Sequence, residues 1–148
     1  MSLRSESTRT PSSTRSRDIA ATRFSHAVVE HEPTTDPVTR EAYSREVISF
    51  GFWFGDPSVP YPAFYAYVSP EPDGVADRAL PGGAEWLDRG ASHLAIYPLE
   101  AAKSTADPRS AVLDFWEAAY RAGAEPAGWD LARHACVDGA TDPFAAAR

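Results

Sequence analysis

The sequence predicts an α+β fold, in which a small, mostly antiparallel sheet packs against an amphipathic helix near the C-terminus. Three segments, 45–54, 63–69 and 92–99, alternate their side chains with the period of a β-strand. One segment, 107–122, repeats its apolar residues at helical spacing instead. A chain of 148 residues is long enough for one domain with its own core.

The first seventeen residues, MSLRSESTRTPSSTRSR, contain almost no apolar side chain. Such a segment cannot bury enough surface to offset the entropy lost on ordering, so we predict a disordered Ser/Thr/Arg-rich tail at 1–17. The tail lacks the apolar core of a secretory signal and the amphipathic face of a transit peptide. The α+β domain is therefore expected at 18–135, with a frayed, Ala-rich C-terminus at 136–148.

The domain is expected to begin with a short strand at 18–25, where residues alternate, followed by a polar connection. Asp36 and Pro37 have the chemistry of a helix start, because a carboxylate caps free N–H groups and proline fits the first helical turn. This pair predicts a two-turn helix over 37–44.

The aromatic stretch from Arg45 to Val68 is predicted to form two inner strands. In 45–54 both faces of the strand are mostly apolar, which indicates a strand covered on both sides. The loop that follows, GDPSVPYP, contains three prolines and breaks the strand. The second strand is then expected at 63–69.

The C-terminal part is predicted to supply one helical turn at 84–88, a strand at 92–99 and a long helix. Asp107 and Pro108 repeat the helix-start chemistry, and Gly123 is expected to end this helix after residue 121 or 122. A last helical turn is expected at 129–135. The buried stripe of the long helix is expected to consist of Val112, Phe115, Trp116, Ala119 and Tyr120.

Charge and composition limit the classes of partner. The net charge is −7, and since residues 1–17 carry +3, the remainder carries −10. Nucleic acid is not expected as a partner because phosphate binding requires clustered cations. A membrane span is excluded because no run approaches the roughly 18 apolar residues that a span requires. The single cysteine, Cys136, allows no internal disulfide and favours a reducing, cytoplasmic location.

Several short motifs resemble one known family. They are TRFS, VTREAYSREV, GFWFGD, PAFYAYVSPEPDG, IYPLEAA, DPRSAVLDFWEAAY and GWD, in this order over about 18–132. They resemble the C-terminal half of the DUF5996 family of uncharacterised bacterial proteins. The resemblance implies a fold but no activity, and implies that a strand-rich N-terminal half is missing here. Arg45 stands where such proteins tend to have a histidine, and Phe54 where they tend to have a proline.

Two carboxylates are the candidate catalytic residues, since a carboxylate entering an aromatic-lined sheet can have its pKa raised and act as a general base. They are Glu46 and Glu71. The alternative for Glu46 is an ion pair with Arg45 or Arg40 at a strand edge. The candidate ligand-binding residues are Tyr43, Trp53, Tyr65 and His93.

The segment containing His26, Glu30, His31 and Glu32 has ligand-type side chains, but His26 and Glu30 share a face only on a helix. Because this segment contains two valines and leads into a proline, we expect a solvated connection, and no metal or other cofactor.

Three functions remain open at this point. The first is a non-catalytic binding or interaction domain for an unknown small molecule or protein partner, with association through an exposed sheet edge or apolar surface. The second is an enzyme with a carboxylate base in an aromatic pocket. The third is a truncated chain without independent activity.

Overall fold

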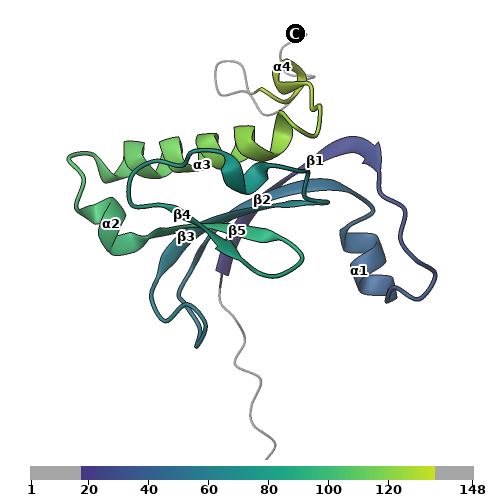
Figure 1. Cartoon of the computed structure of the whole chain (residues 1–148), viewed down its shortest axis with the longest axis horizontal. Coiled ribbons are helices and arrows are strands. Elements are labelled where there is room, and N and C mark those ends of the chain that lie inside the picture. Colours follow the sequence, from purple (N-terminus) through teal and green to yellow (C-terminus); the bar gives the residue numbers. More distant parts are fainter. Residues whose placement is uncertain (1–17, 136–148) are drawn as a thin grey trace, which may run out of the picture.

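The computed structural model describes residues 18–135, which form a five-stranded antiparallel sheet with helices on one face (Figure 1). The strands are β1 (Asp18–Val28), β2 (Arg45–Trp53), β3 (Ala63–Ser69), β4 (Glu85–Asp88) and β5 (His93–Pro98), and their order in the sheet is β1-β2-β3-β5-β4. The α+β class is confirmed. The tail at 1–17, the C-terminal segment at 136–148 and Cys136 lie outside the described residues.

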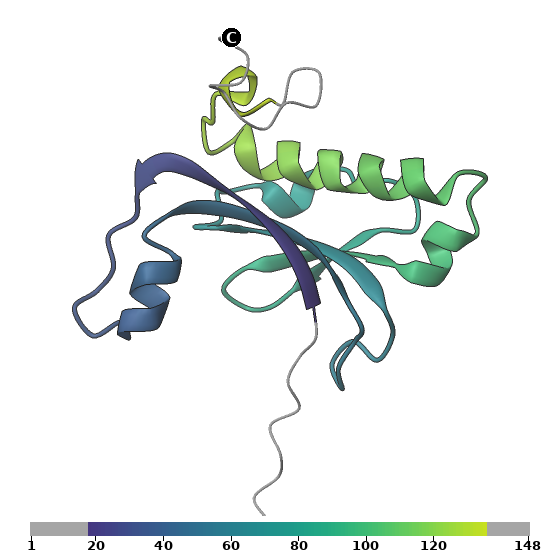
Figure 2. The same cartoon turned by 180° about the vertical axis from the view of Figure 1, so that it is seen from behind.

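The helices are α1 (Pro37–Ala42), α2 (Leu99–Lys103), α3 (Pro108–Ala124) and α4 (Leu131–His134), with a 3-10 turn η1 (Val75–Asp77). In both views α3 crosses one face of the sheet, and α1 lies beyond the end of the sheet, on the connection between β1 and β2 (Figures 1 and 2). Within residues 18–135, none of the helices combines the length and apolar character needed to cross a bilayer.

The strands β2 and β3 form the middle of the molecule, as their alternation predicts. Ile48 is paired with Val68 and Phe50 with Ala66, so the even-numbered residues of both strands face α3. The odd-numbered residues face the opposite side, where the ring of Tyr65 lies against Gly51. A Cβ at Gly51 would lie 2.6 Å from that ring, so this position requires glycine.

The helix α3 supplies the cover of the sheet. Asp107 accepts a hydrogen bond from the backbone N–H of Ser110 at 3.1 Å, and Pro108 occupies the first turn, as predicted. Phe115 is fully buried. The helix does not end before Gly123, as the sequence suggested, but continues to Ala124. A Cβ at Gly123 would lie 3.1 Å from the Cβ of Val68, so this glycine permits close packing of helix on sheet.

Other element boundaries also differ from the predictions. The helical turn predicted at 84–88 is wrong, because Glu85–Asp88 is strand β4, paired with β5. Trp86 packs on the core from this strand, and its Nε1–H donates to the carbonyl of Arg78 at 2.9 Å, which holds the segment extended. The first strand extends to Val28 with an irregularity after Phe24, α1 ends at Ala42, and α2 was not predicted.

The placement of α3 leaves most of β1 uncovered. The helix contacts β2, β3 and β5, while β1 forms the edge of the sheet beyond it. Figure 2 shows β1 as a long, curved strand along this edge. Ile19, Phe24 and Val28 of β1 are 73%, 51% and 66% exposed, respectively. Of these three, Ile19 is paired with Phe52 and lies on the α3 side, whereas Phe24 and Val28 are paired with Val47 and Arg45 on the opposite side. Ile19 is therefore the exposed apolar side chain of β1 that lies beside the helix.

Candidate ligand-binding groove

A hollow of about 590 Å³ lies between β1 and α3, and we name it the β1–α3 groove. Its floor is formed by β2, one wall by β1 and the other wall by one flank of α3. Its lining consists of residues 19–23 and 50–52 together with Leu113, Trp116, Glu117 and Tyr120.

Local structure explains why this lining is apolar. The alternation of β1 directs Ile19, Ala21 and Arg23 toward the α3 side, where they are paired with Phe52, Phe50 and Ile48 of β2, respectively. On α3 the four lining residues are spaced i, i+3, i+4 and i+7, which places them on one flank. Leu113 on this flank is 49% exposed, so both walls present large aliphatic side chains to solvent.

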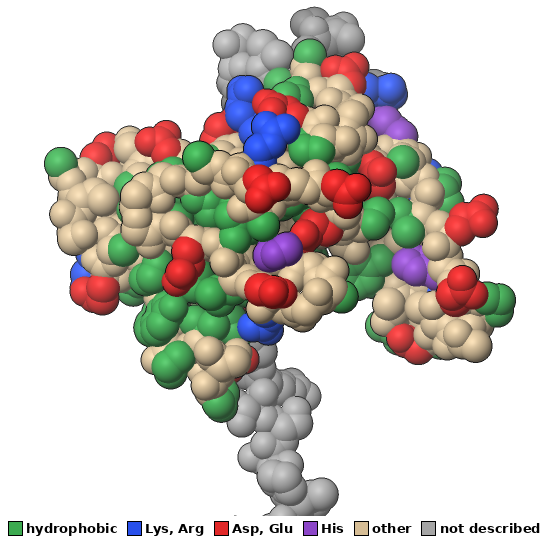
Figure 3. Space-filling view, in the orientation of Figure 1, with side chains coloured by type: hydrophobic (Ala, Val, Ile, Leu, Met, Phe, Trp, Pro, Cys, Tyr) green, Lys and Arg blue, Asp and Glu red, His purple; other side chains and the backbone are tan. Residues whose placement is uncertain are grey.

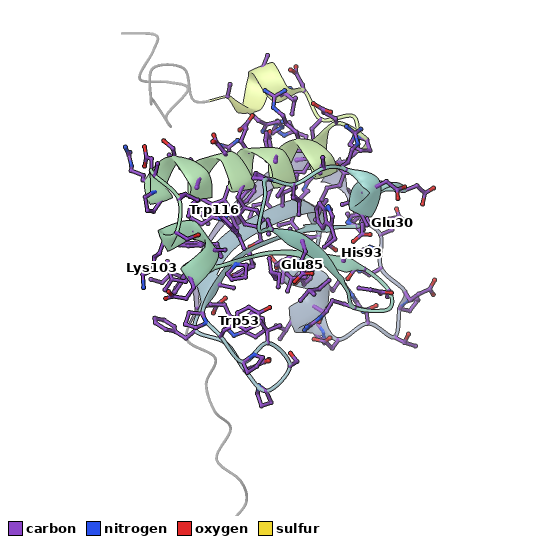
Figure 4. All side chains as sticks on the ribbon, turned by 60° about the vertical axis from the view of Figure 1, so that its left-hand side comes forward. Glu30, Trp53, Glu85, His93, Lys103 and Trp116 are labelled. Atoms are coloured by element: carbon purple, nitrogen blue, oxygen red, sulfur yellow. The ribbon has the colours of Figure 1, made fainter. Side chains whose placement is uncertain are left out.

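A second hollow of about 420 Å³ continues along the same flank of α3 toward α2. The two hollows share Leu113 and Trp116, and Phe64 of β3 lies in the second. Trp116 lies between α3 and the sheet (Figure 4). Its Nε1–H donates to the carbonyl of Tyr65 at 3.2 Å, and its ring meets Phe64 edge-on, with the ring centres 5.7 Å apart. The two hollows together form an elongated trough along α3.

The charged groups of the groove are few. The guanidinium carbon of Arg23 lies 4.9 Å from the centre of the Tyr120 ring. Among residues 18–135 no carboxylate lies within 4.0 Å of Arg23, whereas Glu117 is bound by Arg121 at 2.7 Å. Arg23 is therefore the cation of the groove that remains open to a ligand.

Of the predicted catalytic carboxylates, Glu46 faces the α3 side near the ends of β1 and α3. Its Oε2 accepts hydrogen bonds from Ser25 Oγ and Trp129 Nε1, both at 2.7 Å. These two bonds connect β1, β2 and the segment before α4. The lining of the β1–α3 groove does not include Glu46, and its predicted role as a base stays a prediction.

Glu71 and His93, predicted separately, lie together in the structure. Glu71 Oε1 is 2.7 Å from His93 Nδ1, and its other oxygen accepts the backbone N–H of His93. The hydrogen bond that His93 makes to Glu71 raises the pKa of His93. Burial has a smaller, opposite effect, and the charges of Glu71, Asp88 and Asp77 raise this pKa further. In Figure 3 the face carrying β4 and β5 has many acidic side chains. The Glu71–His93 pair connects the start of β5 to the segment after β3.

The predicted aromatic residues Tyr43, Trp53 and Tyr65 lie elsewhere, on or beside the face of the sheet away from α3. Tyr65 donates to Asp18 Oδ2 at 2.9 Å, and the hydroxyls of Tyr43 and Tyr67 are 3.3 Å apart. Burial, followed by the hydrogen bond to Asp18, raises the pKa of Tyr65. Burial, followed by the hydrogen bond to Tyr43, raises the pKa of Tyr67 to about 12. Both tyrosines are therefore neutral at physiological pH.

The histidine and glutamates of 26–32 do not form a helical face, since His26 lies in β1 and Glu30, His31 and Glu32 follow it in a loop. His31 Nε2 lies 2.7 Å from the backbone carbonyl of Tyr43. In the part of the chain that the structure describes, no group of three His, Cys, Asp or Glu side chains has a geometry suited to a metal ion.

The residues of the groove were missed by sequence reasoning. Ile19, Ala21 and Arg23 alternate on one side of a strand that the sequence did predict, and this alternation was the available signal. Leu113 lies beside the predicted buried stripe of α3, next to Asp114. Its position shows that the apolar stripe of the helix is wider than the contact with the sheet.

Residues 14–136 match DUF5996, described as a family of unknown function. The chain belongs to the DUF5996 family. No curated protein and no solved structure matches the chain.

The DUF5996 match covers every described element, from β1 to α4. The residues of the β1–α3 groove, the Glu71–His93 pair and Glu46 all lie within it. The groove is therefore part of the DUF5996 domain itself.

Proposed function

We propose that this DUF5996 domain is a non-catalytic binding domain that holds an elongated apolar ligand in the β1–α3 groove. The observation that carries the proposal is the apolar trough along α3, in which Ile19 and Leu113 present exposed side chains from opposite walls. Its first hollow, about 590 Å³, falls within the range of roughly 300 to 1,000 Å³ found for small-molecule sites.

Binding is favoured over catalysis because the groove lacks a convergent set of reactive groups. The predicted bases, Glu46 and Glu71, lie outside its lining. Glu46 accepts hydrogen bonds from Ser25 and Trp129, and Glu71 is bound by the ring and the backbone N–H of His93. The hydroxyl of Tyr120 is buried and has no hydrogen-bond partner among the described residues. Glu117, the one carboxylate of the lining, is bound by Arg121, so the lining contains no pair of a nucleophile and a base. A rigid apolar site with a few charged groups at its rim is typical of ligand binding.

The test uses the neutral dye Nile red, whose fluorescence rises in an apolar site. We expect saturable binding to the whole chain, and a loss of affinity of about tenfold or more in Leu113→Glu, because a ligand would have to desolvate the new carboxylate. The matched control is Val38→Glu, which places the same charge on α1 at a side chain that is 78% exposed and outside the groove. This control should bind like the wild type.

Equal affinity of Leu113→Glu and the wild type would contradict the proposal. Light scattering on the same samples addresses the possibility that the chain has no independent activity. A wild-type protein that aggregates and binds dye only in its aggregates would also contradict the proposal.

A further inference from the structure

We infer that the ligand of the groove is an organic acid with a long acyl chain, whose carboxylate pairs with Arg23 and whose chain runs along α3 past Trp116 into the second hollow. This inference rests on the proposed function and names the class of molecule that the groove takes. It is carried by the charge at one end of the trough, by the apolar lining between the ends and by the length of the trough.

The anionic head is argued from Arg23. Its strand β1 is fixed by pairing with β2, and its guanidinium is positioned 4.9 Å above the Tyr120 ring. A guanidinium presents a planar set of donors that matches a carboxylate in two parallel hydrogen bonds. Arg23 has no carboxylate within 4.0 Å in residues 18–135. The carboxylate of a bound acid would therefore supply the ion pair that the described residues do not.

The opposite end of the trough also contains two cations, Lys103 and Arg109, of which Lys103 is already paired. Lys103 is bound by Glu100 at 2.8 Å. Arg109, like Arg23, has no carboxylate within 4.0 Å among residues 18–135, and it lies in the first turn of α3. We place the head of the acid at Arg23 because its guanidinium is held over the Tyr120 ring, and Arg109 is the alternative position that the experiment below distinguishes.

The acyl chain is argued from the length and lining of the trough. From Arg109 to Tyr120 the flank of α3 spans about 16 Å at 1.5 Å per residue. A single acyl chain reaches about 15 Å, because two of them span the roughly 30 Å hydrocarbon core of a bilayer. Leu113 and Trp116 line both hollows, so a chain that enters the first can continue along them into the second.

The test measures displacement of Nile red by octanoate, dodecanoate and dodecanol from the wild type, Arg23→Gln and Arg109→Gln. We expect the wild type to prefer dodecanoate over dodecanol by about tenfold or more, as for a hydrogen bond to a charged group. Arg23→Gln should lose this preference and keep its affinity for the neutral dye, whereas Arg109→Gln, at the opposite end of the trough, should keep the preference. Dodecanoate should bind at least about tenfold tighter than octanoate, because its additional methylenes are buried.

Equal affinity for dodecanoate and dodecanol would overturn the inference while dye binding still supported the proposed function. A loss of the acid preference in Arg109→Gln but not in Arg23→Gln would overturn the placement of the head. Equal affinity for octanoate and dodecanoate would overturn the path of the chain past Trp116. If the wild type binds no dye, the proposed function itself fails.

Discussion

Replacing Gly51 with alanine should destabilise the domain by about 1.5 to 4.5 kcal/mol, because this residue lies where β1, β2 and a tyrosine ring meet. A Cβ at Gly51 would lie 2.4 Å from the carbonyl oxygen of Ile19 and 2.6 Å from the ring of Tyr65. Ordinary contact begins near 3.4 Å, so the carbonyl has to retreat by about 1 Å and the ring by slightly less in a close-packed interior. The carbonyl belongs to the backbone, and the ring of Tyr65 is buried and held by a hydrogen bond to Asp18.

The magnitude follows from what must move. Ile19 is paired with Phe52, so a retreat of its carbonyl separates the first residues of β1 from β2. The ring of Tyr65 is held by its hydrogen bond to Asp18, also at the start of β1. Overpacking typically costs about 1 to 3 kcal/mol, and one lost hydrogen bond adds about 0.5 to 1.5 kcal/mol.

The measurement is urea unfolding followed by tryptophan fluorescence. The matched control is Gly82→Ala, because a Cβ at Gly82 meets nothing within 4 Å. This control should be neutral or more stable than the wild type by about 0.4 to 1 kcal/mol, since alanine restricts the unfolded chain. A free energy of unfolding for Gly51→Ala within about 0.5 kcal/mol of the wild type would refute the packing of Tyr65 and β1 around this glycine.

Three further predictions concern the core and the polar pairs. Phe115→Ala should lower the free energy of unfolding by about 3 to 5 kcal/mol, because this ring is fully buried; a loss below about 1 kcal/mol in urea unfolding would contradict the packing of α3. Glu71 raises the pKa of His93 above its ordinary value of 6.5. The pair therefore stabilises the fold fully below pH 6.5, and this contribution is lost as the pH rises through the folded pKa. The stability lost in His93→Gln should shrink from pH 5.5 to pH 8.5, and a pH-independent loss would refute this role of the pair. Trp129→Phe removes a donor to Glu46 and should cost about 1.5 to 3 kcal/mol, with non-additive losses in a double-mutant cycle with Glu46→Gln; additive losses would show that the bond contributes nothing.

Local signals in the sequence predicted most elements of the fold. The Asp-Pro pairs at 36–37 and 107–108 start α1 and α3 in the structure, because capping depends on neighbouring residues alone. β4 was assigned wrongly because its four residues, EWLD, are too few to distinguish a period of 2 from one of 3.6. Its extended form depends on pairing with β5, a contact that local sequence does not contain.

The residues predicted to form one site lie on different faces of the sheet because side chains alternate along a strand. Glu46 and Trp53 are close in sequence, but one is even-numbered and the other odd-numbered on β2, so they point to opposite faces of the sheet. Conversely, Glu71 and His93 are 22 residues apart and meet because β3 and β5 are neighbours while β4 lies outside them. The residues that meet in each site depend on which strands are paired. The alternation of side chains along one strand does not show which strand will be its neighbour.

Two kinds of molecule could cover the exposed apolar walls of the groove: a ligand inside it, or a second copy of the chain. The positions of the two walls distinguish between them. Burying a side chain such as Ile19 or Leu113 stabilises by roughly 1.5 to 3 kcal/mol, so whatever covers both gains this energy. A copy that paired along the free edge of β1 would reach the exposed residues of that strand, but Leu113 lies on α3 across the groove floor. A molecule inside the trough contacts both walls at once, and for this reason a charge at Leu113 separates the two kinds of cover: it weakens a ligand in the groove and leaves an edge-paired dimer unchanged.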